Sequence, residues 1–146
     1  MRLVVDASVA VKWVFPDPVK EPHVDQALAL LEEARTGRVS LLQPPHWLAE
    51  VSAVITRVQP GIADHAIRLL DALDLPVMGE VEVYRRASRI SRELEHHLFD
   101  TLYHAVALEH DGFLISADDH YIRKASRLGS ILPLANWPEG VSLDSE

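Results

Sequence analysis

"RLVVDASVAVKWVF", residues 2–15, sets a pattern that the rest of the chain repeats. Residues 2–5 form a short apolar run rich in β-branched valine, which predicts a buried strand, and the run ends at an acid, Asp6. Residues 8–15 then have the spacing of a helix, and the prolines within residues 16–22 end it. The stretch therefore predicts a strand, a turn that carries a carboxylate, and a helix.

Strands and helices continue to alternate along the chain. Helical periodicity recurs at residues 23–38, 44–58, 62–73, 80–94, 97–110 and 118–128, with Gly37 as the expected C-terminal cap of the first of these. Short apolar runs suited to strands lie at residues 39–43, 75–78, 112–116 and 131–135. This order predicts an α/β fold: a single three-layer α/β/α domain over residues 1–138 with a mainly parallel central sheet and right-handed crossovers. Residues 139–146 are predicted to be a flexible acidic tail.

The composition limits the class of protein. A chain of 146 residues fits one compact domain. It has no cysteine, which excludes disulfides and thiolate metal sites and agrees with a reducing cytoplasm, the expected location. No run of about 18 apolar residues occurs, so no membrane span is expected. The net charge of −8 argues against a protein that coats nucleic acid with a broad basic surface.

Arginines nevertheless cluster in residues 85–92. The common interpretation is a solvated helix face, with Tyr84, Ala87, Ile90 and Leu94 packed inward. If a basic patch guides RNA, this stretch is the one we expect to do so.

Four acids fall where such a fold would build a site. Asp6 directly follows the first strand, and Asp118 follows strand 112–116 after one alanine; ligands bind beyond these strand ends in a doubly wound sheet. Glu50 lies in helix 44–58 beside its apolar stripe. Asp100 lies in the first turn of helix 97–110, whose apolar stripe, expected to face the core, is Phe99, Leu102, Tyr103 and Val106. An N-terminal cap would explain Asp100 taken alone.

Converging carboxylates need a counter-charge. At a separation of about 5 Å and an effective dielectric constant near 20, each pair of carboxylates repels by roughly 3 kcal/mol. A divalent cation removes this conflict, and an all-oxygen site suits Mg²⁺ or Mn²⁺. Such an ion can activate water, so the reaction that the four acids indicate is metal-assisted hydrolysis of a phosphodiester.

These residues resemble the motifs of a known family. "VVDASV" (residues 4–9), Glu50 within "WLAEVSAV", "FDTLYHAVA" (99–107) and "ISADDHYI" (115–122) are similar, in order and spacing, to the four motifs of the PIN domain in the small form represented by VapC toxins. The resemblance implies that Asp6, Glu50, Asp100 and Asp118 hold one or two Mg²⁺ or Mn²⁺ ions. It further implies cleavage of single-stranded RNA, inhibition by a small VapB-like antitoxin whose tail enters the cleft, and a homodimer.

Several neighbouring residues have open roles. The fourth motif carries Ser116 where the family commonly has threonine, and Asp119 is an additional acid beside Asp118. Ser8 matches the small hydroxyl residue of the family and would either bind a water of the metal or cap a helix. His104 is interpreted as a partly buried or exposed histidine. The histidines at 96, 97, 110 and 120 lack the His-Glu-x-x-His spacing of a zinc-protease helix, so no zinc site is predicted from them.

Two other classes of function are left to weigh. A non-catalytic PIN-like module that binds protein or RNA is the main alternative, although such modules often lose acids that this chain retains. A phosphotransferase of the haloacid-dehalogenase type would place a second aspartate where Ser8 stands. A receiver domain would have paired acids after the first strand and a lysine near the last strand, and this chain has neither.

Overall fold

A four-stranded sheet forms the centre of the protein in the computed structural model, which describes residues 1–15 and 21–139. The strands are β1 (Arg2–Val5), β2 (Ser40–Leu41), β3 (Phe113–Ser116) and β4 (Ile131–Pro133), in the spatial order β2-β1-β3-β4. Each pairing between neighbours is parallel, with Leu3 opposite Leu41 on one side and Phe113 on the other. The predicted α/β domain with a mainly parallel sheet is confirmed.

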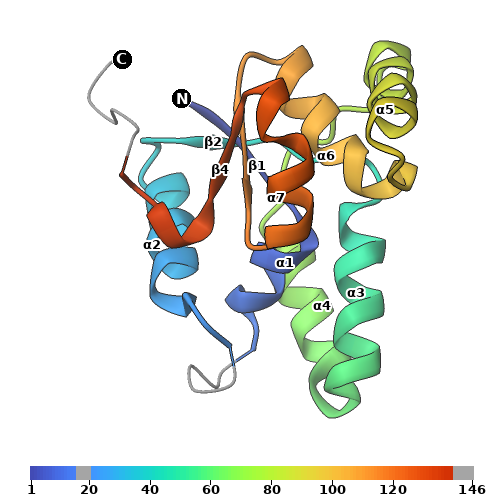
Figure 1. The fold of residues 1–146 in the computed structure, drawn as a ribbon. Helices are drawn as coiled ribbons and strands as arrows, with labels where there is room; N and C mark the ends of the chain where they lie inside the picture. The colour runs from blue at the N-terminus through green and yellow to red at the C-terminus, as the bar shows by residue number, and fades with distance from the viewer. Residues whose placement is uncertain (16–20, 140–146) are drawn as a thin grey trace.

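Helices cover both faces of this sheet (Figure 1). They are α1 (Ala7–Ala10), α2 (Val24–Arg35), α3 (Trp47–Val58), α4 (Ala63–Ala72), α5 (Val81–Leu94), α6 (Leu98–Glu109) and α7 (Asp119–Ala125). The described residues also form four short 3-10 helices: η1 (Val11–Trp13), η2 (Pro60–Ile62), η3 (Ser126–Leu128) and η4 (Leu134–Asn136). The chain crosses the sheet in one direction from β1 to β2 and in the other from β3 to β4, so right-handed crossovers place α2 and α7 on opposite faces. Helix α6 packs on β1 and β3, and α5 packs on α6.

The middle residues of the central strands are apolar because both faces of the sheet are covered. Leu3, Val4 and Val5 are fully buried in β1, as are Leu114 and Ile115 in β3. A side chain on Gly112 would place its Cβ 2.6 Å from the carbonyl oxygen of Arg2, so the approach of the chain to β3 leaves room only for glycine. This close contact lies at the amino-terminal starts of β1 and β3, at the opposite edge of the sheet from Asp6.

A buried glutamine fixes the end of β1. The side chain of Gln43 is fully buried; its Oε1 accepts a hydrogen bond of 3.0 Å from the backbone N of Val5, and its Nε2 donates one of 2.9 Å to the carbonyl oxygen of Val5. The amide thus extends the ladder between β2 and β1 by one step after β2 itself has ended. The backbone immediately before Asp6 is therefore held on both of its polar groups.

The strand order creates a crevice at the edge of the sheet where the carboxyl ends lie. The chain leaves β1 toward β2 on one side and leaves β3 toward β4 on the other, so β1 and β3 flank a topological switch point. Ligands of doubly wound folds bind outside the strand ends at such a point. Asp6 follows one of these strands and Asp118 follows the other.

Three sequence expectations about burial and strands were wrong. Residues 75–78 form no strand; Val77 makes an isolated bridge to Gln43, and the neighbouring Pro76 lacks the N–H that a ladder needs. Phe99 is 57% exposed, because it lies in the first turn of α6 before the helix reaches the core. Tyr84, expected to pack inward, is 40% exposed on α5.

Helix starts and one histidine also differ from expectation. Asp100 is the third residue of α6, and His97 occupies the cap position, so Asp100 is no cap. Ser8 is likewise inside α1, which begins after Asp6. His104 is fully buried, with Nδ1 3.0 Å from the hydroxyl of Tyr121 and Nε2 2.8 Å from the carbonyl oxygen of Gly129. Its role is to join α6 to the segments on either side of η3.

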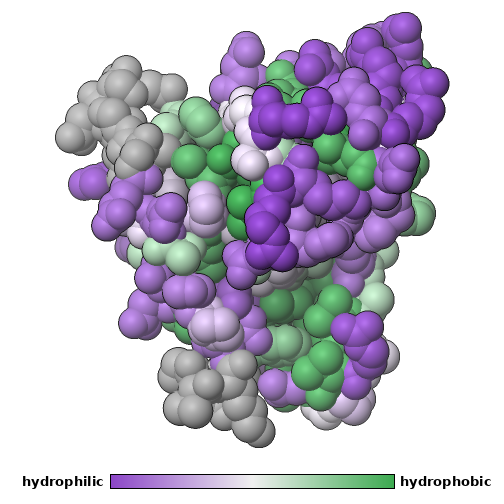
Figure 2. Space-filling view, in the orientation of Figure 1, coloured by the Kyte–Doolittle hydropathy of each residue, from purple (hydrophilic) through white to green (hydrophobic). Residues whose placement is uncertain are grey.

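The surface differs between regions of the molecule. Figure 2 shows hydrophilic residues over α5 and α7 and apolar residues gathered over the lower part of α3 and α4, where Val58 and Leu69 are exposed. No helix within the described residues combines the length and the hydropathy needed to cross a membrane. Residues 140–146 of the predicted tail lie outside the described part of the chain.

Candidate functional site: an acid pocket at the strand ends

The four predicted acids line one pocket of about 240 Å³. Asp6 comes from the end of β1, Glu50 from α3, Asp100 from the first turn of α6 and Asp118 from the start of α7. The rest of its wall is Ala7, Ser8, Val11 and Val54, so the described residues that line it include no lysine or arginine. We call this pocket the acid pocket.

Two serine hydroxyls hold Asp6. Ser8 donates a short hydrogen bond to Oδ1 of Asp6, and Ser116 donates one of 2.5 Å to Oδ2. The same hydroxyls accept hydrogen bonds from the backbone beyond β3: Ser8 from the N of Ala117 at 3.0 Å, and Ser116 from the N of Asp118 at 3.1 Å. Asp6 is therefore fixed at both oxygens, and the two strand ends are tied together through it.

The electrostatics of the acid pocket converge on Asp6. The pKa of Asp6 is raised to about 6: burial raises it most, the hydrogen bonds from Ser116 and Ser8 lower it, and the nearby charges of Asp100 and Asp118 raise it. Near neutral pH the ionised carboxylate is thus only weakly favoured. The pocket has more negative charge than its own residues compensate.

Glu50 is held from α6. The hydroxyl of Tyr103 donates a hydrogen bond of 3.1 Å to Oε1 of Glu50, and Nε2 of His46 lies 3.5 Å from Oε2. The pKa of Tyr103 is raised, first by burial and then by Glu50, so this phenol stays a hydrogen-bond donor at neutral pH. The carboxylate itself remains 27% exposed.

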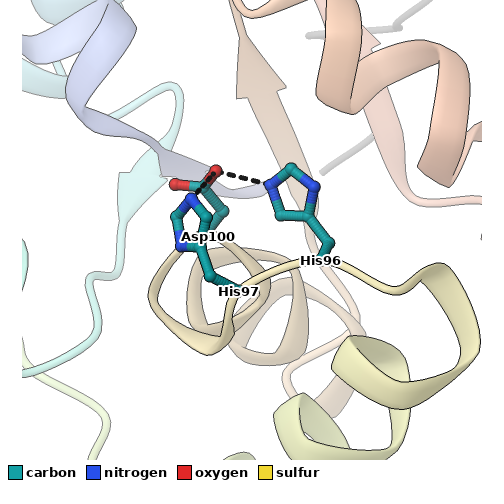
Figure 3. A group of neighbouring side chains, drawn as sticks. All are labelled: His96, His97 and Asp100. Atoms are coloured by element: carbon teal, nitrogen blue, oxygen red, sulfur yellow. Dashed lines mark hydrogen bonds and ion pairs between the residues drawn. The ribbon is translucent and has the colours of Figure 1, made fainter.

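Two histidines contact Asp100, and sequence reasoning missed them. Nε2 of His96 lies 2.7 Å and Nε2 of His97 3.0 Å from Oδ2 of Asp100. Figure 3 shows both rings turned toward this carboxylate from the segment that precedes α6. The sequence signal for these contacts is that His96 and His97 lie four and three residues before Asp100, at a helix start. The spacing between the histidines themselves does not indicate these contacts.

The remaining candidates lie at the start of α7. Asp118 caps this helix, because its Oδ1 accepts a hydrogen bond of 3.1 Å from the backbone N of Tyr121. Asp119 is the first residue of α7; it is exposed and is not part of the wall of the acid pocket. Ser8 and Ser116 act on Asp6 as described above.

The donor set of the acid pocket fits a hard divalent cation. Carboxylate and hydroxyl oxygens are the ligands that Mg²⁺ and Mn²⁺ prefer. The pKa of Asp6 is raised first by burial and then by the charges of Asp100 and Asp118, and a bound cation would stabilise the ionised carboxylate against both. Asp6, Glu50, Asp100 and Asp118 are the residues that would hold it.

Comparison with known proteins agrees with this geometry. A search of curated proteins found no match. The family model of the PIN domain matches residues 3–127, a range that contains the four acids, β2, β3 and all but the first residue of β1. PIN domains are usually nucleases and typically bind divalent metals. Since the match covers most of the chain and the sheet is parallel as such a fold requires, the chain belongs to the PIN domain family.

Proposed function

We propose that this chain is a metal-dependent endoribonuclease that cuts single-stranded regions of RNA and acts as the VapC-like toxin of a type II toxin–antitoxin pair. The observation that carries the proposal is the acid pocket, in which four carboxylates from four segments of the chain meet at the switch point of the sheet. The complete set of acids favours a nuclease over a non-catalytic module.

The chain's own residues would prepare the site. When bound, Mg²⁺ or Mn²⁺ supplies Lewis acidity for attack of water on a phosphodiester. Ser8 and Ser116 keep the Asp6 carboxylate in one orientation, and Gln43 fixes the backbone that precedes it. Tyr103 orients Glu50 in the same way. These contacts would orient the acidic ligands before the metal and RNA arrive, which reduces the cost of ordering them during the reaction.

A basic surface on α5 supports RNA as the substrate. Tyr84, Arg85, Ser88, Arg89 and Arg92 line a hollow of about 400 Å³. Arg85 is paired with Glu82 at 3.0 Å. Guanidinium groups bind phosphates, and an exposed tyrosine ring offers a face on which a base can stack. We expect this surface to bind the RNA strand outside the acid pocket.

An apolar groove supports a protein partner. Leu28, Leu31, Leu41, Leu73 and Leu75 contribute to the wall of a groove of about 610 Å³ at α2 and the end of α4. Leu28 is 45% exposed and Leu73 is 36% exposed. Exposed apolar surface of this kind suits the burial of an apolar segment from an antitoxin, while the acid pocket suits a basic side chain from its tail. A homodimer is the expected assembly of the chain itself.

The decisive test is cleavage of a mixed RNA panel by the purified chain with Mg²⁺, with Mn²⁺ and with a chelator, beside Asp6→Asn. We expect cuts that require metal and that the variant does not make. Calorimetric titration with Mn²⁺ separates the nuclease from the non-catalytic module. A chain that does not bind metal and does not cut RNA is the non-catalytic module.

The toxin assignment has its own test. Induced expression in a bacterial host without a partner should arrest growth, and Asp6→Asn should not. If both cultures grow at the same rate although the chain cleaves RNA in vitro, the chain is a nuclease but not a toxin.

A further inference from the structure

His96 and His97, which the proposed nuclease does not use, form a group with Asp100. One nitrogen of each ring and one oxygen of Asp100 all lie within 4.8 Å of one another. Both short contacts are made to the same oxygen, Oδ2, and neither histidine is part of the wall of the acid pocket. Figure 3 shows a ring nitrogen of each histidine directed at this carboxylate.

The local backbone brings these side chains together before any ligand binds. Helix α5 ends at Leu94, and Glu95 adopts a left-handed conformation with φ of 50°, which reverses the chain. His97 then takes an extended conformation at the cap of α6, three residues before Asp100. The backbone N of His96 donates a hydrogen bond of 3.1 Å to the carbonyl oxygen of Ser91, which fixes the turn.

Ring packing further orders the two imidazoles. The rings of His96 and His97 are stacked with their centres 4.7 Å apart, and the edge of Tyr121 packs on His96 at 5.1 Å. The side chain of His96 is only 8% exposed, whereas that of His97 is 64% exposed. One ligand is thus rigid, and the other can adjust its position at little cost.

The chemistry of this group differs from that of the acid pocket. Two imidazoles and one carboxylate are a common ligand set for Zn²⁺, which binds nitrogen at about 2.0–2.1 Å and keeps a further position for water when three protein ligands are present. Ligand atoms around a tetrahedral ion of this size lie about 3.3 Å apart. The contacts of 2.7 and 3.0 Å with Asp100 would therefore open slightly, and the two imidazole nitrogens, which lie within 4.8 Å of one another, would adopt the same spacing. Mg²⁺ prefers oxygen ligands and would not select this group.

One neighbouring cation opposes metal binding here. Nζ of Lys124 lies 3.3 Å from Nδ1 of His96 and donates a hydrogen bond of 3.2 Å to the carbonyl oxygen of Glu95. Because lysine only donates, Nδ1 accepts and Nε2 carries the proton that points to Asp100. A metal can bind at Nε2 of His96 only if this proton leaves Nε2. Lys124 therefore lowers the affinity of the group for a metal, but both histidines and Asp100 remain available as ligands.

We propose that His96, His97 and Asp100 form a zinc site next to the acid pocket, with water completing the coordination. The zinc site and the acid pocket share Asp100 but differ in metal preference. The zinc site offers two nitrogen ligands, whereas the acid pocket offers only oxygen ligands. Zinc binding does not depend on the proposed nuclease activity, so a chain that cuts no RNA still tests it.

The test is titration of the full, untagged chain with Zn²⁺ by calorimetry, followed by Co²⁺, whose visible absorption reports nitrogen ligands and a low coordination number. We expect one Zn²⁺ per chain. His97→Ala should weaken binding by at least about tenfold, because even outer contacts of a metal ligand are worth about 10- to 100-fold. This residue is exposed, so the variant should unfold at the same temperature as the wild type.

Matched variants locate the ion. His65→Ala removes an exposed histidine on α4 and should change nothing, whereas Lys124→Gln should strengthen binding by removing the opposing charge. Asp118→Asn should leave zinc binding largely intact. Absence of binding by the wild type, equal binding by His97→Ala, or loss of binding in Asp118→Asn alone would overturn the proposal.

Discussion

The two halves of the acid pocket are held by different chemistry. On the strand half, Asp6 and Asp118 follow β1 and β3 and are linked through serine hydroxyls and backbone N–H groups. On the helix half, Glu50 and Asp100 extend from α3 and α6 and are contacted by a phenol and by imidazoles. All four acids are partly buried, and the side chains of Glu50 and Asp100 on the helix half are each 27% exposed.

This difference assigns separate tasks to the halves. We expect the strand half to fix the position of a cation, because Asp6 directly follows a paired strand and both of its oxygens are held by serine hydroxyls. We expect Glu50 and Asp100 on the helix half to adjust more easily, because their side chains extend from helices and are open to solvent.

The largest effect is expected from the strand half. Asp6→Asn should lower RNA cleavage on the order of 10³-fold or more, because the variant loses a central ligand whose position nothing else can take. Glu50→Gln, the corresponding change on the helix half, should cost less, on the order of 10- to 100-fold, because a water can reach the exposed position. The measurement is the initial rate of cleavage with saturating Mn²⁺. Equal losses in the two variants would show that both halves position the cation alike.

The pH dependence of stability should also follow Asp6. Its pKa is about 6 in the folded chain and 3.8 as an unperturbed group. Well below pH 3.8 the carboxyl is protonated in both states and has no effect on stability. Between about pH 3.8 and 6 the unfolded chain loses this proton first, so the folded state is progressively destabilised, and above pH 6 the difference is constant. The free energy of unfolding should fall by at most about 3 kcal/mol between pH 4 and pH 7 through this group.

Denaturant titrations in the presence of a chelator check this sign. The wild type should lose stability over that pH range relative to Asp6→Asn, and Mg²⁺ should restore it. If the free energy of unfolding depends on pH in the same way in both proteins, the ionised Asp6 carboxylate does not destabilise the fold.

The strand half is also the half that sequence reasoning predicted well. A valine-rich run that ends in an acid predicts both the strand and the position of Asp6, because parallel strands in a covered sheet are apolar throughout. Asp118 was placed by the same argument, two residues past β3. What no pattern indicates is the contact of Ser8 with the N of Ala117, since these residues are 109 positions apart and meet only through the register of the sheet.

The helix half was predicted less well for a physical reason. Periodicity averages over a whole helix, so it assigned Phe99 to the core although the first turn of α6 extends beyond it. The same first turn contains Asp100, whose partners His96 and His97 lie before the helix and outside its periodicity. The fold and the four acids were therefore accessible from the sequence, while the contacts that tune them depend on helix ends.

Removal of the hydroxyl that holds Asp6 should have an intermediate effect. Ser116→Ala deletes a hydrogen bond that lowers the pKa of Asp6 and leaves the backbone N of Asp118 without its acceptor. The affinity for Mn²⁺ should fall by about 10- to 100-fold, as expected for an outer contact of a metal ligand. Ser116→Thr is the matched control, because it keeps the hydroxyl. Calorimetric titration decides, and equal weakening by both variants would attribute the effect to packing in β3.

The smallest effect is expected for the equivalent contact on the helix half. Tyr103→Phe removes the hydrogen bond of 3.1 Å to Glu50 and nothing else, since the ring of Tyr103 is fully buried and phenylalanine fills the same space. Glu50 keeps its contact with His46 and is open to water, so the lost bond is replaced in part. The affinity for Mn²⁺ should fall by no more than about 3- to 10-fold, the range of a single neutral hydrogen bond of roughly 0.5–1.5 kcal/mol. A loss as large as that of Ser116→Ala would mean that the phenol on α6 fixes the cation as firmly as the serines do, and the rigid part of the site would then extend beyond the strands.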